Sequence, residues 1–175
     1  MPGLSSFAVE PAPEFRYSPL PMIPNIPALF NALASIPVLT GISTPAQTLL
    51  AEEGIVRDFG AGTWIVREGD KGNSLFILVE GDVEVVKHAD TPNAVTLDTL
   101  HTGTFFGEMC IVEPMPRAAS VRTLSPVKAI EIKAITLYHL FQQMPDQYSI
   151  VILNLARDMA RRLRKLDEAF AARAS

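Results

Sequence analysis

The sequence predicts a mainly β domain, a jelly roll with flanking helices and a long C-terminal helix. Short segments rich in β-branched residues follow one another at even spacing between residues 55 and 132, with turn residues between them. Helical apolar periodicity precedes and follows this block. With 175 residues, 48% of them apolar, the chain is large enough to bury one hydrophobic core.

Seven segments are expected to be strands. They are Ile55–Phe59, Thr63–Arg67, Ser74–Glu80, Asp82–His88, Ala94–Leu100, Ala118–Thr123 and Val127–Ile132. Turn signals at Gly60–Gly62, Gly69–Asp70, Gly81–Asp82 and Gly103 separate them. Within one segment Val83, Val85 and Lys87 alternate with Glu84 and Val86, the pattern of a half-buried strand.

The chain before the strands divides into an arm and supporting helices. Residues 1–27 contain seven prolines and are expected to form an extended arm or linker. Alternatively, this arm packs on a partner through its apolar residues Phe15, Tyr17, Leu20 and Met22. Helical spacing begins at Ala28 with Leu29, Phe30, Leu33 and Ile36, and a second helix is expected from a Thr44 cap and Pro45 to Gly54.

The last forty residues are predicted to form two helices. Thr136–Met144 ends at Pro145, and Asp146 is expected to cap a long helix that occupies residues 146–175. Its apolar positions step by threes and fours: Tyr148, Ile152, Leu155, Met159, Leu163, Leu166 and Phe170. This spacing predicts a dimerisation seam, and the alternative is a helix packed on its own domain. The β-roll with its supporting helices is therefore assigned to residues 28–145.

Composition and charge exclude several classes of protein. The net charge is −4 and the pI is about 5.4, so the chain lacks the overall positive charge that is typical of nucleic-acid-binding proteins. The basic cluster Arg157, Arg161, Arg162, Arg164 and Lys165 is mixed with acidic residues and is expected to be a solvated helix face. The single cysteine, Cys110, cannot form an intramolecular disulfide. The chain has no signal-peptide pattern and no apolar run long enough for a membrane span, and we expect a cytoplasmic protein.

The stretch Phe106–Val121 contains the residues with the clearest chemistry. Gly107 and Glu108 stand at the start of a short apolar helix, and Arg117 follows nine residues after Glu108. Glycine permits close approach of a ligand to the backbone, and an arginine fork can bind two phosphate oxygens. An ionised glutamate only accepts hydrogen bonds, so beside a phosphate it suits ribose hydroxyls. This combination indicates a site for a sugar-phosphate ligand. The alternative is that Glu108 and Arg117 form only a surface ion pair.

The same stretch, ending in Pro116-Arg117-Ala118-Ala119-Ser120, resembles the phosphate-binding cassette of cyclic nucleotide-binding domains. Such domains occur in protein kinase A regulatory subunits and catabolite-activator-type regulators. Glycines at the family's positions and the string Met159-Ala-Arg-Arg-Leu163 extend the resemblance to about residues 29–166; the glycines are 62, 69, 81, 103 and 107. The resemblance implies a cyclic nucleotide-binding β-roll in which Arg117 binds the cyclic phosphate and Glu108 binds the ribose 2′-OH.

The remaining expected ligand contacts follow from the same resemblance. The cassette residues Phe106, Met109 and Cys110 surround the ligand, while Gly107, Ala118 and Ala119 supply backbone for close approach and Ser120 a hydroxyl. In the family a threonine at position 118 favours cGMP, so Ala118 implies cAMP, with cGMP as the other candidate ligand. Leu166 is expected to cover the purine, although activator-type proteins have a hydroxyl pair where this chain has Leu166 and Asp167.

These features predict a cAMP-preferring sensor module that moves its C-terminal helices on binding and signals to an unidentified effector protein as a homodimer. One alternative is a transcription-regulator subunit without its own helix-turn-helix, and another is a ligand-free structural module. No nucleophile–base pair or carboxylate dyad predicts an enzyme. His88, His101 and His139 lack metal-ligand spacing, so neither a metal nor a resident cofactor is expected, and neither is membrane or nucleic-acid binding.

Overall fold

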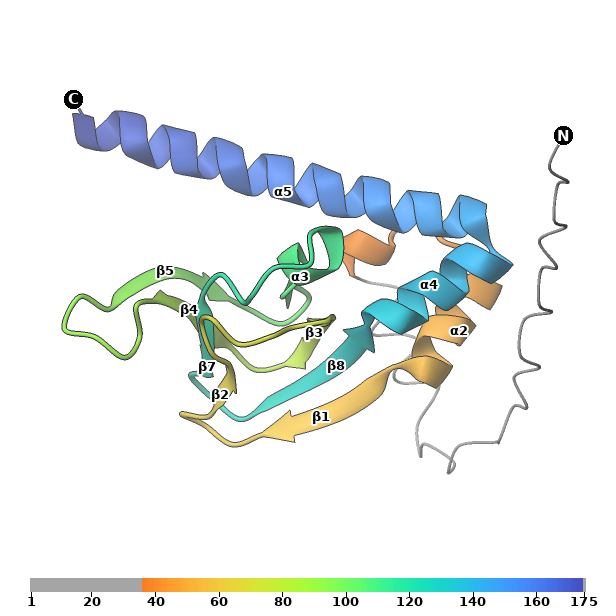
Figure 1. The fold of residues 1–175 in the computed structure, drawn as a ribbon, viewed down its shortest axis with the longest axis horizontal. Helices are drawn as coiled ribbons and strands as arrows, with labels where there is room; N and C mark the ends of the chain where they lie inside the picture. The colour runs from red at the N-terminus through yellow and green to blue at the C-terminus, as the bar shows by residue number, and fades with distance from the viewer. Residues whose placement is uncertain (1–35, 175) are drawn as a thin grey trace, which may run out of the picture.

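The computed structural model describes residues 36–174, with side chains to Ala172. The predicted helical segment from Ala28 to Ile36 lies outside this range except for its last residue, Ile36, which is not helical. The strands are β1 (Ile55–Phe59), β2 (Trp64–Val66), β3 (Ser74–Glu80), β4 (Val83–Lys87), β5 (Val95–Leu100), β6 (Phe105–Phe106), β7 (Ser120–Thr123) and β8 (Val127–Lys133). The helices are η1 (Pro37–Leu39), α2 (Thr44–Glu53), α3 (Met109–Val112), α4 (Ala134–Gln143) and α5 (Pro145–Ala174), as Figure 1 shows.

The strands form two four-stranded antiparallel sheets, in the orders β1-β8-β3-β6 and β2-β7-β4-β5. This arrangement confirms the predicted β-roll with flanking helices and a long C-terminal helix. Sequence analysis missed β6, because a two-residue strand between Gly103 and Gly107 is too short to show a period. It pairs with β3 and leads directly into the cassette.

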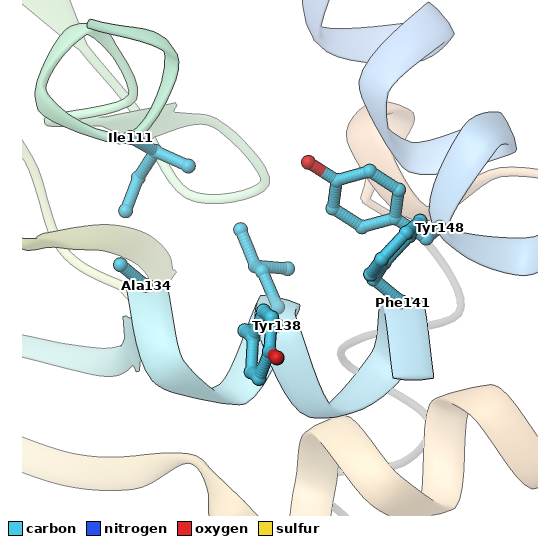
Figure 2. A pocket seen from close by; sticks show the side chains of 6 residues that line it. Ile111, Ala134, Tyr138, Phe141 and Tyr148 are labelled. Carbon is cyan, nitrogen blue, oxygen red and sulfur yellow. The ribbon is translucent and has the colours of Figure 1, made fainter. Parts of the chain in front are cut away.

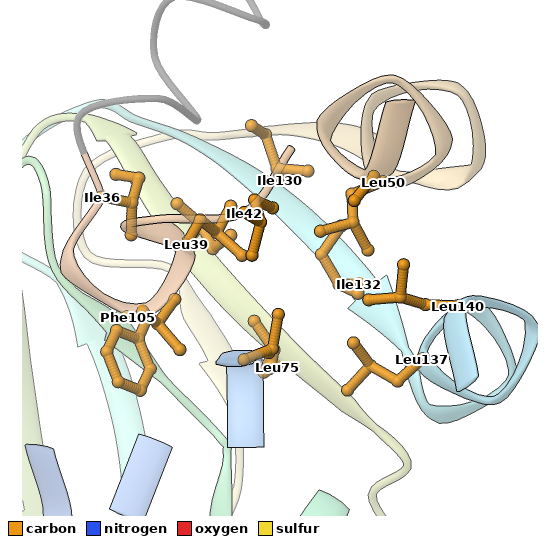
Figure 3. Packing of buried hydrophobic residues seen from close by; sticks show 14 of the residues in the cluster. Ile36, Leu39, Ile42, Leu50, Leu75, Phe105, Ile130, Ile132, Leu137 and Leu140 are labelled. Carbon is orange, nitrogen blue, oxygen red and sulfur yellow. The ribbon is translucent and has the colours of Figure 1, made fainter. Parts of the chain in front are cut away.

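The strand β3 is buried on both faces, which explains its nearly continuous apolar sequence. Leu75 and Ile77 face one hydrophobic cluster, together with helical residues, while Phe76 and Leu78 face a second cluster inside the roll. Figure 3 shows the first cluster, in which Leu50 of α2 and Leu137 and Leu140 of α4 pack against the sheet residues Ile130 and Ile132. Burying each such side chain stabilises the fold by roughly 1.5–3 kcal/mol.

The predicted alternation along β4 is confirmed for Val83 and Val85, because Val83 lies in the cluster inside the roll and Val85 packs against it. Val86, on the other face, is also buried, so the strand is not half-buried at this position. In the pairing with β5 the register shifts after Val85, and the extra residue is Leu97 of β5.

The first residues of α2 and α5 differ slightly from the predicted helix starts. Thr44 is the first residue of α2 rather than its cap, and Ser43 precedes the helix. The helix α5 begins at Pro145, one residue before the predicted cap Asp146. Proline is favourable in a first helical turn because its missing N–H would have no intrahelical partner there.

The helix α5 crosses over α3 and continues along the roll (Figure 1). In its first half Val151 and Leu155 belong to the core, and Asn154 donates hydrogen bonds to the carbonyl oxygens of Val38 and Thr40. The predicted seam therefore contains a residue, Leu155, that packs on its own domain. In the second half Leu163, Leu166 and Phe170 are exposed.

Candidate functional site

Arg117 is buried at the end of the cassette, with 6% of its surface exposed. Its Nη1 donates to the carbonyl oxygens of Ser74 (2.7 Å) and Gly107 (3.2 Å), and its Nη2 donates to Ser74 Oγ (3.2 Å). A guanidinium has five N–H donors. The Nε–H and one Nη2–H have no partner among the described residues, so Arg117 keeps donors for an additional acceptor.

Two glycines make this position of Arg117 possible. A Cβ on Gly72 or on Gly107 would collide with the guanidinium group. Gly107 also has φ +83°, in the left-handed region that favours glycine. Gly107 thus permits the close approach of Arg117 as well as the backbone approach predicted for a ligand.

The backbone of Arg117 is fixed by the turn after β2. Gly69 N–H donates to the carbonyl of Arg117 (2.9 Å), and Arg117 N–H donates to the carbonyl of Asp70 (2.8 Å). Beside it, Ser120 Oγ accepts a hydrogen bond from Glu68 N–H at 2.9 Å. The buried hydroxyl of Ser120 therefore already has a structural partner.

Lys87 and Glu68 support the same segment. Lys87 Nζ donates to the carbonyl of Ala118 (2.7 Å) and lies 2.8 Å from Glu68 Oε1. The hydrogen bond from Lys87, followed by one from the backbone N–H of His88, lowers the pKa of the Glu68 carboxyl. The arginine end of the cassette is therefore held by contacts within the roll.

The other end of the cassette is held by α5. Glu108 is 5% exposed and precedes α3, and Arg162 Nη1 donates to its Oε1 at 3.3 Å. Arg162 Nη2 also donates to the carbonyl of Phe105 (2.9 Å), and its Nε lies 2.6 Å from Asp158 Oδ2. The described residues provide no partner for Glu108 Oε2, which remains available as an acceptor.

Arg162 is a site residue that the sequence analysis missed, and the prediction that its whole basic cluster is solvated is wrong at this position. Its side chain is about one-third exposed and contacts the cassette. The spacing along the helix could have indicated this contact. Arg162 follows Val151, Leu155 and Asp158 at intervals of four, three and four, which places it on the helix face that packs against the domain. A buried carboxylate such as Glu108 also requires a compensating group.

The structure does not support the alternative of a surface ion pair between Glu108 and Arg117. Both side chains are buried, and among the described residues Glu108 pairs with Arg162 while Arg117 pairs with Ser74 and Gly107. The two ends of the cassette therefore have separate partners.

The other predicted ligand contacts occupy varied environments. Phe106 is buried and stacks on Phe76, with 5.2 Å between ring centroids, and Cys110 is buried. Met109 and Ala118 are exposed, and Ala119 is half-buried. Leu166 is 60% exposed, about one turn beyond Arg162 on α5. Its contact with a purine stays a prediction.

Two pockets adjoin the cassette. One of about 240 Å³ lies beside Arg117; its lining residues are Ile65, Val66, Asp70, Lys71, Gly72, Asn73, Ser74, Phe76, Arg117 and Glu131. The other, also about 240 Å³, lies between α3, α4 and the start of α5. Figure 2 shows Ile111, Tyr138, Phe141 and Tyr148 around this apolar pocket. This apolar pocket leaves space beside α3, the short helix of the cassette.

The histidines are each paired with a carboxylate: His88 with Glu68, His101 with Asp82 and His139 with Glu53. Within residues 36–174 no group of three or more potential ligands is placed to bind a metal ion. Over the same residues, no helix combines the length and apolar character that a membrane crossing requires.

Comparison with known proteins identifies the family. The family model of the cyclic nucleotide-binding domain matches residues 56–144, which include the cassette, most of the roll and α4. The chain therefore belongs to the cyclic nucleotide-binding domain family.

The curated relatives include kinases and transcription regulators. The chain is 33% identical over 98 residues to cGMP-dependent protein kinase isozyme 1 of Drosophila melanogaster, covering 55% of this chain and 13% of the kinase. It is 28% identical over 133 residues to the CRP-like cAMP-activated global transcriptional regulator of Mycobacterium tuberculosis, covering 76% of this chain and 58% of the regulator. The match thus spans less than two thirds of either relative.

Solved structures support the same fold. A cyclic nucleotide-binding domain from Methylobacillus flagellatus superposes with a TM-score of 0.74 at 22% identity, covering 85% of this chain and 83% of the other. The catabolite activator protein of Thermus thermophilus gives a TM-score of 0.67 at 25% identity, covering 79% and 63% of the two chains.

Proposed function

We propose that this protein is a cAMP-preferring sensor module and not an enzyme. The observation that carries the proposal is the buried Arg117, fixed by Ser74 and Gly107 with two N–H donors left over. A cyclic phosphate is a suitable acceptor for these donors, because charge-assisted hydrogen bonds from arginine to phosphate are strong and directional. The family membership and the cAMP-activated relative support the same ligand class.

Glu108 provides the second contact in this proposal. Its Oε1 accepts from Arg162, and its Oε2 is available to the ribose 2′-OH. An ionised carboxylate accepts a short, strong hydrogen bond from a hydroxyl. Ribose binding and the docking of α5 on the cassette therefore act on the same side chain.

The preference for cAMP rests on Ala118. Its methyl side chain has no hydroxyl to accept from the guanine amino group. One missing hydrogen bond is worth about 0.5–1.5 kcal/mol, which corresponds to an affinity difference of up to roughly tenfold.

Signalling follows from the contacts of the cassette with the C-terminal helices. A nucleotide bound to Glu108 stabilises the conformation of the cassette end that Arg162 contacts. Binding therefore favours the conformations in which α5 is docked on the cassette. Ile111 of α3 borders the apolar pocket together with Tyr138 of α4 and Tyr148 of α5, which gives the cassette helix a second route to these helices. The output acts on an effector protein in the cytoplasm, with the module present as a homodimer through α5.

Titration calorimetry with cAMP and cGMP tests this proposal. The expected result is saturable binding of both nucleotides with tighter binding of cAMP. A preference for cGMP would contradict the role of Ala118, and no binding of either nucleotide would indicate the ligand-free structural module. Binding of cAMP together with specific binding of DNA would favour the transcription-regulator alternative.

A further inference from the structure

The apolar pocket between α3, α4 and the start of α5 is lined by a row of three aromatic rings. The ring centroids of Tyr138 and Phe141 are 6.4 Å apart, and those of Phe141 and Tyr148 are 5.4 Å apart. Ile111 of α3 borders the same pocket (Figure 2). Because Tyr138 and Phe141 are 53% and 46% exposed, the row of rings is accessible to a ligand.

Two phenol groups add hydrogen-bond donors to this apolar surface. The Tyr138 hydroxyl accepts from Gln142 Nε2 at 2.8 Å, which leaves its own O–H able to donate. The Tyr148 hydroxyl has no hydrogen-bond partner among the described residues, and Figure 2 shows its ring extending from α5 toward Ile111. The pocket therefore suits a ligand that combines apolar side chains with unpaired carbonyl oxygens.

A segment of the chain before the described residues has this chemistry in its sequence. Residues 20–27 contain three apolar–proline pairs at a spacing of three residues: Leu20-Pro21, Ile23-Pro24 and Ile26-Pro27. A polyproline II helix repeats every three residues and forms no internal hydrogen bonds. In that conformation the three pairs lie along one side, and the backbone carbonyl oxygens are free to accept. We call residues 20–27 the proline segment.

We propose that the proline segment docks in the apolar pocket of its own chain. Aromatic-lined grooves bind proline-rich segments because the polyproline II conformation is preformed and loses little entropy on binding. One turn of this helix is about 9 Å long, which is comparable with the row of three rings, so two successive apolar–proline pairs can contact the row at once. The phenol groups of Tyr138 and Tyr148 then donate to the carbonyl oxygens of the segment.

The position of Ile36 brings the proline segment within reach of the pocket. Ile36 is buried in the hydrophobic cluster that contains Leu137 and against which Ile111 and Tyr148 pack. Pro27 precedes Ile36 by nine positions, a distance of at most roughly 30 Å when the chain is extended. A short connection gives the segment an effective concentration on the order of millimolar, so it competes well with segments of other molecules. The proline segment thus acts as an intramolecular cover of the apolar pocket.

Fluorescence anisotropy of a labelled synthetic peptide with the sequence of residues 18–28 tests the proposal on the full chain without nucleotide. In the wild type the chain's own proline segment competes with the peptide. The double substitution Pro21→Ser and Pro24→Ser should open the pocket, so that the peptide binds with an apparent dissociation constant at least roughly tenfold lower than for the wild type. The matched control, Pro11→Ser with Pro13→Ser, changes the same arm outside the proline segment and should behave as the wild type.

A second pair of variants locates the peptide in the pocket. In the chain with Pro21→Ser and Pro24→Ser, Phe141→Ser removes the middle ring of the row and should weaken peptide binding by at least roughly tenfold. Phe170→Ser is the same substitution at an exposed phenylalanine of α5 that does not line the pocket, and it should leave peptide binding unchanged. Both phenylalanines are exposed, so the fold is expected to tolerate either change.

Three results would overturn the proposal. One is equal peptide binding by the wild type and by the chain with Pro21→Ser and Pro24→Ser, or no binding to either. Another is an equal effect of Phe141→Ser and Phe170→Ser. The third is competition in the wild type that disappears on dilution, which would assign the proline segment to a second copy of the chain. Because no nucleotide is present, the outcome is independent of the sensor function.

Discussion

The two ends of the cassette are held in different ways. At one end, Arg117 is fixed by Ser74 of β3, by Gly107 at the start of the cassette and by backbone pairing with the turn after β2. At the other end, Glu108 takes its partner, Arg162, from the C-terminal helix. The partners of Arg117 among the described residues thus do not include any residue of α5, whereas the partner of Glu108 is present only while α5 is docked.

Replacing Arg117 should have the largest effect. Arg117→Ala is expected to weaken cAMP binding by roughly 2–5 kcal/mol, because it removes the buried cationic partner of the phosphate. Arg117→Lys should recover only part of the loss, since an ammonium lacks the two-pronged geometry. Titration calorimetry measures both variants, and undiminished affinity of Arg117→Ala would refute the role of Arg117.

The same substitution should also reduce stability. The sequence alone predicts that the fold tolerates Arg117→Ala because the arginine's partner is a ligand. The structure adds that Ser74 and Gly107 lose hydrogen-bond donors, and each buried group left unpaired costs about 1–3 kcal/mol. Urea unfolding without ligand should show this loss, and a midpoint equal to that of the wild type would argue against the observed contacts.

Glu108→Gln should have a smaller effect on binding than Arg117→Ala. The amide keeps an acceptor for the ribose but loses the charge that strengthens both this hydrogen bond and the contact with Arg162. We expect a loss of about 1–2 kcal/mol in cAMP affinity by calorimetry. A loss as large as that of Arg117→Ala would contradict the distinction between the two ends.

The smallest expected effect concerns Glu68, which supports the arginine end through Lys87. Its pKa is lowered in the folded protein from an ordinary value of 4.5, so its contribution to stability is present above that value and is lost as the pH falls through the folded pKa. Glu68→Gln should therefore destabilise the protein near about pH 7 and have less effect near about pH 3. Urea unfolding at the two pH values measures this, and an equal effect at both would contradict the assignment.

The sequence predicted those parts of the fold that depend on local pattern. The strands β1 and β3 were predicted with the observed bounds, because their β-branched residues are enclosed by clear turns. The register shift between β4 and β5 was not predictable, because it depends on how the two strands pair and not on the pattern of either strand alone. The N-terminal arm, residues 1–27, lies outside the described residues, and its role stays a prediction.

For the site, the sequence predicted the residues within the cassette but not those that hold them. Gly107, Glu108 and Arg117 lie within one short stretch of sequence, so their residue types and spacing could be recognised as a motif. The structure places them in one region. Ser74 is 43 positions before Arg117, and Arg162 is 54 positions after Glu108. Their contributions arise only from tertiary packing, which brings β3 and α5 to opposite ends of the cassette.

A double-mutant cycle in cAMP affinity tests the difference between the two ends most directly. Calorimetry would compare Arg162→Ala in the wild type, in Glu108→Gln and in Arg117→Lys. We predict that Arg162→Ala weakens cAMP binding in the wild type and to the same degree in Arg117→Lys, but has little effect in Glu108→Gln, where its partner charge is absent. An equal effect of Arg162→Ala in all three backgrounds, or none in the wild type, would contradict the dependence of the glutamate end on α5.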